Sequence, residues 1–202
     1  MRKAASIARG APSDTSVPRT PLMKRLKLMR PSPIVTGGGM TTWEEVATVT
    51  FDPVGSPLKR ITLFRAMSSS PGSGPITITF PNNVSNAQWI VTQWEGVDIS
   101  GTNGSGAIVQ TGSARADAVS GLSVTLAPFE SATNAAHGVF GVNSSTAAVT
   151  PGSGYAEMAE AASAESPPTA LQAEWATNVN TVAALWSSLR AGALAVEIRA
   201  RQ

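Results

Sequence analysis

From Trp43 to its C-terminus, the sequence consists of short β-prone segments parted by clusters of Pro, Gly, Asn and Ser. In 45–51, Val, Thr and Phe recur with a period of two, and 76–80 alternates in the same way, which is typical of strands with one buried face, while 88–94 is mostly apolar. We expect strands at 45–51, 59–67, 76–80, 88–94, 106–110, 122–126, 138–142, 155–159, 171–176, 182–186 and 193–200. The pattern therefore predicts an all-β protein, an antiparallel and jelly-roll-like β-sandwich.

The first 31 residues differ from the rest of the chain in charge and in proline content. Eight basic residues and one acid give them a formal charge of +7, whereas seven basic and twelve acidic residues give the other 171 residues a charge of −5. Because prolines interrupt regular hydrogen bonding, we expect residues 1–36 to be irregular. Gly37, Gly38 and Gly39 mark a hinge. The sequence therefore predicts a basic arm and hinge at 1–39 and one β-sandwich domain at 40–202.

The basic arm is the strongest functional signal in the sequence. Such a charge docks on an acidic neighbouring subunit, binds nucleic-acid phosphates without base specificity, or stays solvated. No aromatic residues alternate with the cations, so base stacking is not indicated. Residues 22–29 (LMKRLKLM) suit a helical turn or two, or an extended segment bound to a partner. The candidate partner-binding cations are Arg2, Lys3, Arg9, Arg19, Lys24, Arg25, Lys27 and Arg30.

Catalytic and metal-binding side chains are scarce. The chain has no Cys and one histidine, His137, so a single chain cannot build a His/Cys metal cluster. We expect His137 to be a strand or turn residue with a satisfied ring nitrogen. Adjacent Glu44 and Glu45 point to opposite faces of a strand, and Glu157 and Glu160, three apart, are expected to diverge as well. We therefore expect no catalytic residue, no cofactor and no metal.

Residues 98–106 (DISGTNGSG) form an oxygen-rich glycine loop. Oxygen ligands of this kind bind hard cations such as Ca²⁺, but the loop has a single carboxylate, Asp98, and lacks the EF-hand spacing. The other interpretation is a set of tight turns in which Asn103 and Gly104 supply positive φ angles. We favour the tight turns.

Five tryptophans provide the main argument for a ligand-binding surface. Exposed tryptophans on a sheet stack on sugar rings, although aromatic side chains in strands more often belong to the core. Because Trp89 and Trp94 are five residues apart, they face opposite sides of a regular strand, and at least one is expected in the core. The candidate glycan contacts are Trp43, Trp89, Trp94, Trp175 and Trp186.

Membrane and targeting signals give a negative result. No apolar run approaches the length of a membrane helix, and the basic N-terminus lacks the apolar stretch of a secretory signal. Its Arg-rich, acid-poor composition is similar to a mitochondrial transit peptide, but its prolines argue against that interpretation. We expect no membrane contact.

Several phrases between Trp43 and Ala200 resemble β-sandwich modules that recur in virion-associated proteins of tailed bacteriophages and prophages. They are turn and strand phrases rather than catalytic signatures. The resemblance implies a virion or cell-surface context and brings no catalytic residues with it. The phrases are 89–101 (WIVTQWEGVDISG), 104–110 (GSGAIVQ), 122–129 (LSVTLAPF), 134–141 (NAAHGVFG), 151–155 (PGSGY), 171–175 (LQAEW) and 195–200 (AVEIRA).

The start of the chain departs from these modules, which usually open with one or two further strands before a Gly-rich turn and a Trp. Here the basic arm precedes Gly37, so we expect the sheet to lack a strand and to leave an unpaired edge. An exposed edge is sticky unless something covers it. A neighbouring subunit's arm or strand is able to cover it by strand addition.

Two functions from different classes are therefore expected. The first is a structural protein of the phage virion, a capsid-associated, decoration or tail component, which forms a homo-oligomer and meets other virion subunits through its arm and sheet edges. The alternative is a carbohydrate-binding adhesin or fibre domain, which uses its tryptophans and the loops at 98–106 and 143–154. A hydrolase built on two facing carboxylates comes third.

Overall fold

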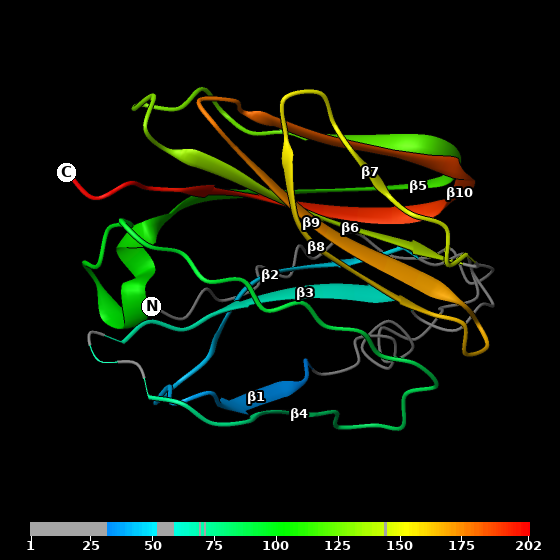
Figure 1. Cartoon of the computed structure of the whole chain (residues 1–202), viewed down its shortest axis with the longest axis horizontal. Helices are drawn as coiled ribbons and strands as arrows, with labels where there is room; N and C mark the ends of the chain where they lie inside the picture. The colour runs from blue at the N-terminus through cyan, green and yellow to red at the C-terminus, as the bar shows by residue number, and fades with distance from the viewer. Residues whose placement is uncertain (1–31, 52–58, 69, 71, 144) are drawn as a thin grey trace, which may run out of the picture. The chain divides into compact units, whose positions relative to one another are not determined.

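The computed structural model describes residues 32–51, 59–68, 70, 72–143 and 145–202, which form an antiparallel, all-β body (Figure 1). The all-β, antiparallel class expected from the alternating segments is confirmed, and the jelly-roll-like connectivity stays a prediction. The elements are β1 (Ile34–Gly37), β2 (Glu44–Thr50), β3 (Arg60–Arg65), β4 (Ile76–Thr79), η1 (Thr102–Ala107, a 3₁₀ segment), β5 (Ile108–Thr125), β6 (Ala135–Asn143), β7 (Thr150–Pro151), β8 (Ala156–Ser163), β9 (Thr169–Thr177) and β10 (Thr181–Ile198).

A six-stranded sheet dominates the body, with the order β5-β10-β6-β9-β8 and with β7 joined to β10. β5 and β10 are 18 residues each and pair along most of their length. Register shifts between Leu185 and Ala191 interrupt this pairing, and only the part of β10 from Ala191 onward pairs with β6. The two long strands bend together at these shifts, as bulged strands do at sheet corners (Figure 1).

The bent pair of β5 and β10 encloses the larger core. Val182 and Trp186, from the N-terminal half of β10, pack with Phe140 of β6 and Ala193 of β10. The rings of Trp186 and Phe140 have centroids 6.2 Å apart. The Trp186 Nε1–H donates to the Val119 carbonyl oxygen of the paired strand β5 at 2.8 Å. Because the buried indole keeps a hydrogen-bond partner, its large apolar area stabilises the bend without an unpaired polar group.

The β2–β3 hairpin packs on the opposite face of the large sheet. Phe51, which follows β2, and Ile61 of β3 contact Leu194 of β10, whose neighbours Ala193 and Ala195 belong to the larger core. Two glycines make this approach possible: a Cβ on Gly192 would lie 2.5 Å from Phe51 Cδ1, and one on Gly141 3.1 Å from Ile61 Cδ1. The absence of side chains there lets the two layers meet.

A strand precedes the Gly-rich turn, so the expectation of an irregular 1–36 is wrong for residues 34–36. β1 pairs with β4 from Ile34, opposite Thr79, to Gly37, opposite Ile76. Gly37, Gly38 and Gly39 have φ angles of 84°, 68° and 71°, a left-handed turn that glycine adopts without a steric penalty. The expected absence of an opening strand is also wrong, because β4 supplies a partner that a four-residue segment does not reveal by itself.

Other strand assignments also differ from the prediction. The segments 106–110 and 122–126 contribute to one strand, β5, and the segments 182–186 and 193–200 to β10, because the residues between them continue the ladder. The expected strand at 88–94 joins no sheet in the described structure.

Candidate functional site

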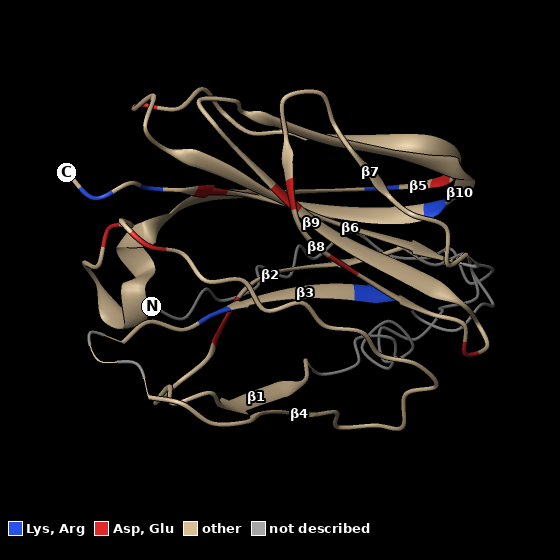
Figure 2. Cartoon of the chain, in the orientation of Figure 1, with Lys and Arg blue, Asp and Glu red and all other residues tan. Residues whose placement is uncertain are grey.

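Two stretches of the body contain no charged residue. No Asp, Glu, Lys or Arg occurs between Arg30 and Glu44 or between Arg65 and Glu95. These stretches include β1 and β4, which pair with each other, and Figure 2 shows both strands and the chain after β4 without a blue or red residue. Ile34 of β1 is 63% exposed there. We call the exposed residues of 32–43 and 72–94 the uncharged surface.

The chain after β4 keeps the alternation of a strand but lacks a strand's partners. From Trp89 to Trp94, side chains are alternately exposed and half-buried, and Trp89 and Val91 are 62% and 60% exposed. Among the described residues, no backbone hydrogen bond joins 81–95 to another segment. The side-chain amides of Asn86 and Gln88 instead donate to backbone carbonyls at the start of β9 and just before it. The uncharged surface therefore combines exposed apolar side chains with unpaired backbone.

The five tryptophans divide between core and surface. Trp186 is buried, and half-buried Trp43 donates its indole N–H to the Gly37 carbonyl oxygen at 3.0 Å. Trp94 is half-buried, while Trp89 is exposed, so the expectation that they face opposite ways with at least one packed inward is confirmed. Trp175 is 37% exposed. Trp89 and Trp175 are therefore the tryptophans with a face open to a ligand.

His137 is a buried residue of β6. Its buried ring meets Trp94 edge to face, with centroids 5.5 Å apart. Its Nδ1 lies 3.1 Å from the Glu174 carbonyl oxygen, so Nδ1 is the donor when the ring is neutral. Burial lowers the pKa of His137 to about 4, and the Glu174 carbonyl opposes this shift. The expectation of a strand residue with a satisfied ring nitrogen is confirmed.

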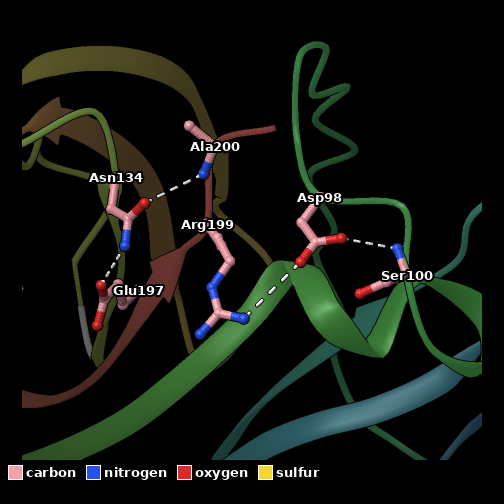
Figure 3. A network of polar contacts seen from close by, with 6 residues as sticks. All are labelled: Asp98, Ser100, Asn134, Glu197, Arg199 and Ala200. Atoms are coloured by element: carbon pink, nitrogen blue, oxygen red, sulfur yellow. Dashed lines mark hydrogen bonds and ion pairs between the residues drawn. The ribbon is translucent and has the colours of Figure 1, made fainter. Parts of the chain in front are cut away.

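The loop at 98–106 joins the C-terminal end of β10 in a polar network (Figure 3). Asp98 Oδ1 accepts from the Ser100 backbone N–H at 2.8 Å, and Asp98 Oδ2 lies 3.8 Å from Arg199 Nη1. The Ser100 hydrogen bonds, with help from Arg199, lower the pKa of Asp98 below its ordinary value. Asn103 and Gly104 have φ angles of 51° and 70°, which confirms the tight-turn interpretation. In the described part of the chain, no group of three His, Cys, Asp or Glu residues is placed to hold a metal.

Glu197 is a buried carboxylate beside this loop. Its Oε1 accepts from Asn134 Nδ2 at 2.6 Å and its Oε2 from Gln110 Nε2 at 2.6 Å. Asn134 Oδ1 in turn accepts from the Ala200 N–H at 3.2 Å (Figure 3). Because both carboxylate oxygens have donors inside the protein, Glu197 joins β5 and β10 to the residue before β6.

β8 lies at an edge of the large sheet, and a bulge changes the face on which its glutamates lie. Glu157 is opposite Glu174, and Glu160 is opposite Gln172, with Met158 inserted between the paired residues. Glu174 and Gln172 are two apart on β9 and share a face, so Glu157 and Glu160 share it too. The expected divergence of the two glutamates is wrong, because a spacing of three across a bulge acts as a spacing of two.

Glu174 lies buried next to the segment that contains β7. One of its oxygens accepts from the Gly152 N–H at 3.3 Å, and the other has no partner in the described chain. Burial raises the pKa of Glu174 above its ordinary value. Glu160 Oε1 accepts from the Val149 N–H at 2.8 Å. These two carboxyl groups anchor the β7 segment, and Glu157 remains exposed at the sheet edge.

The predicted arm cations, Arg2 to Arg30, lie outside the described residues, so their role in partner binding stays a prediction. A scan against protein-family models, a search of curated proteins and a search of solved structures each find no match. Among the described residues, no helix has the length and apolarity to cross a membrane.

Proposed function

We propose that this protein is a structural subunit of a tailed-phage virion, a capsid-associated, decoration or tail component, which assembles with copies of itself and with other virion subunits. The observation that carries the proposal is the uncharged surface. There Trp89 and Val91 are exposed beside backbone that has no hydrogen-bond partner in the described chain. The virion context comes from the resemblance of the sequence phrases to phage modules.

The chemistry of the uncharged surface suits contact with another protein. Interface cores are depleted in charged residues and enriched in aromatic ones. Contiguous exposed apolar patches usually mark a binding surface, and an unpaired β-prone segment invites strand pairing. Because the stretch from Arg65 to Glu95 has no charge between its ends, no charge repulsion within it opposes such pairing. Burial of this surface in an assembly is therefore its most favourable state.

The basic arm supplies a second kind of contact in the proposed assembly. Its +7 charge is opposite in sign to the −5 of the remaining residues, so an arm attracts the body of a neighbouring copy. The same cations also favour non-specific contact with nucleic acid inside a virion.

The proposed function contains no catalytic step. General acid–base catalysis needs a group whose pKa lies near the working pH and which reaches the substrate. His137 is buried with a pKa of about 4, and Asp98 is held ionised by Ser100 and Arg199. These environments suit structural roles.

A carbohydrate-binding adhesin or fibre domain is the second candidate, and the exposed ring of Trp89 favours it. An aromatic face open to solvent is able to stack on a sugar ring. Glycan-array binding that is lost in Trp89→Ala but kept in Trp186→Phe, a change in the core, would support this function. Binding that is unchanged in Trp89→Ala would remove its main argument.

Assembly is tested by electron microscopy and light scattering of the purified full-length chain. We expect particles, tubes or filaments, and we expect Trp89→Lys combined with Val91→Lys to reduce them to small species. Deletion of residues 2–31, which leaves β1 intact, is expected to leave smaller oligomers that are held together by the uncharged surface. A matched control is Leu185→Lys, an exposed apolar residue outside the uncharged surface.

A full-length chain that stays monomeric at high concentration, alone and with its virion partners, contradicts the proposed function. Normal assembly of the Trp89→Lys, Val91→Lys variant would show that the uncharged surface is not the contact.

A further inference from the structure

We propose that the outer edge of β8 receives residues 22–29 of another copy of this chain, which add a strand to the large sheet. This inference rests on the proposed assembly function and names the contact that the arm makes. The β8 edge is separate from the uncharged surface. Each copy would bind a neighbour with its own arm and would bind another copy's arm at its own β8 edge.

β8 has an open edge. Among the described strands, it is the last in the sheet order and pairs only with β9. On its other side, its backbone groups have no backbone partner among the described residues. Such an edge is a template for one more strand, because each added residue pairs with N–H and C=O groups that already lie in register.

The charge of this edge favours a basic partner. No Lys or Arg occurs between Arg115 and Arg190, so β6, β8 and β9 contain no cation, and the exposed charged residues of β8 are both acidic. The red residues on β8 and β9 in Figure 2 accordingly have no blue counterpart on those strands. Glu157 and Glu160 lie on one face of the edge strand, and Glu165 follows it. A basic strand placed here meets several carboxylates and no cation.

The opposite edge of the sheet, β5, does not have the purely acidic charge of β8. Arg115 and Asp117 place both signs of charge on β5. Arg115 Nη1 also donates to the Thr50 carbonyl oxygen of β2 at 3.3 Å, so the β2–β3 hairpin lies close to this edge. Charge therefore selects β8 over β5 for a basic segment.

Residues 22–29 match the β8 edge in length and pattern. The two longest stretches of the arm without Pro or Gly are 1–9 and 22–30, and the second is richer in Leu and Met. β8 has eight residues, as many as 22–29. In an extended strand, Arg25 and Lys27 share one face, as Glu157 and Glu160 do on β8. Cross-strand neighbours of opposite charge stabilise a sheet.

Another copy is the better source of the added strand than the same chain. Met29 is five residues before Ile34, which allows about 17 Å of extended chain. Ile34 begins β1, whose sheet partner is β4 and not the large sheet. A neighbouring copy has no such limit on its reach, and its addition links subunits head to tail.

The test uses disulfide trapping, since the full-length chain has no Cys. One tagged population carries Leu26→Cys and a second, with a different tag, carries Ala159→Cys, which lies on the face of β8 opposite its glutamates. We expect a disulfide between the two tags at low salt, and little with Ser113→Cys on β5 in place of Ala159→Cys. Deletion of residues 2–20 is expected to leave the trapping unchanged.

Charge reversal provides the rescue experiment. Arg25→Glu with Lys27→Glu is expected to slow trapping about tenfold, and so is Glu157→Lys with Glu160→Lys. Combining both reversals in one chain is expected to restore it, which a merely unfolded variant cannot do. Trapping within a single chain, equal trapping at Ser113→Cys, or no recovery in the combined variant would overturn the inference.

Particle formation is measured independently of disulfide trapping at β8. Particles that form normally while β8 is never trapped would overturn the β8 contact and leave the proposed function standing. Trapping at β8 without any particle would support the contact and count against the assembly function.

Discussion

His137 couples the stability of the body to pH at the scale of one residue. Its ring is surrounded by protein, with Trp94 against it and the Glu174 carbonyl at Nδ1. Burial lowers its pKa from 6.5 to about 4, so the neutral ring is favoured in the folded state. The nearby Glu174 carboxyl has its pKa raised by burial, so its protonated form is favoured there instead.

The His137 shift predicts a loss of stability in acid. The contribution of the neutral ring is fully present above pH 6.5 and is lost as the pH falls from 6.5 through about 4. A shift of this size corresponds to about 3 kcal/mol, as an order of magnitude. Urea unfolding at pH 7, 5.5 and 4 measures the free energy, and His137→Gln is expected to reduce its pH slope.

Glu174 acts in the opposite direction, because a raised pKa in the folded state gives stability that is lost as the pH rises. The pH slope of the unfolding free energy is therefore compared with and without His137→Gln in a Glu174→Gln background, which removes the contribution of Glu174. A slope that is unchanged by His137→Gln in this background would contradict the role assigned to the ring.

At the scale of the element, the close approach of two layers depends on glycine in the large sheet. Gly192 of β10 and Gly141 of β6 are paired across the ladder and lie beneath Phe51 and Ile61. In most strands glycine weakens the sheet, but here the missing side chain of Gly192 leaves room for the Phe51 ring. Neither Gly141 nor Gly192 has a positive φ angle. Glycine is therefore needed at these two positions for space and not for backbone conformation.

Gly192→Ala is expected to destabilise the body by about 1–3 kcal/mol, because its Cβ would meet the Phe51 ring at 2.5 Å. Thermal or urea unfolding measures the change. Phe51→Leu in the same chain is expected to recover part of the loss, since the smaller side chain leaves room. Strictly additive effects of the two substitutions would argue against a shared contact.

At the scale of the whole molecule, two surfaces of different chemistry are proposed to act in assembly. One is apolar and uncharged, and the other is the acidic β8 edge that faces a basic arm. Because salt screens exposed charges but leaves apolar contacts intact or strengthens them, ionic strength separates their contributions.

We expect arm-dependent association to weaken about tenfold between low salt and roughly 0.5 M NaCl, as screening shortens the range of the charges. Association through Trp89 and Val91 is expected to persist, so a chain without residues 2–31 is expected to show no such salt dependence. Analytical ultracentrifugation of both chains over a salt series makes the measurement. Equal salt dependence of the two chains would contradict the separation.

The sequence by itself determined the all-β class, the shortage of catalytic side chains, and the division of charge between arm and body. These are properties of local alternation and composition, which need no knowledge of distant contacts. The sequence also contains the uncharged stretches, and the absence of charge between Arg65 and Glu95 is the signal by which they are found.

Only the tertiary structure decided which β-prone segments pair. In 76–79 and in 89–94, exposed and half-buried side chains alternate in the same way. β4 nevertheless pairs with β1, whereas the second segment has no backbone partner in the described chain. The bulge at Met158 brought Glu157 and Glu160 to one face. In β10, the residues between two expected strands continue the pairing with β5, so the two form one strand. Pairing and register depend on partners far away in sequence, whose contacts set β-structure more strongly than the intrinsic preference of any segment.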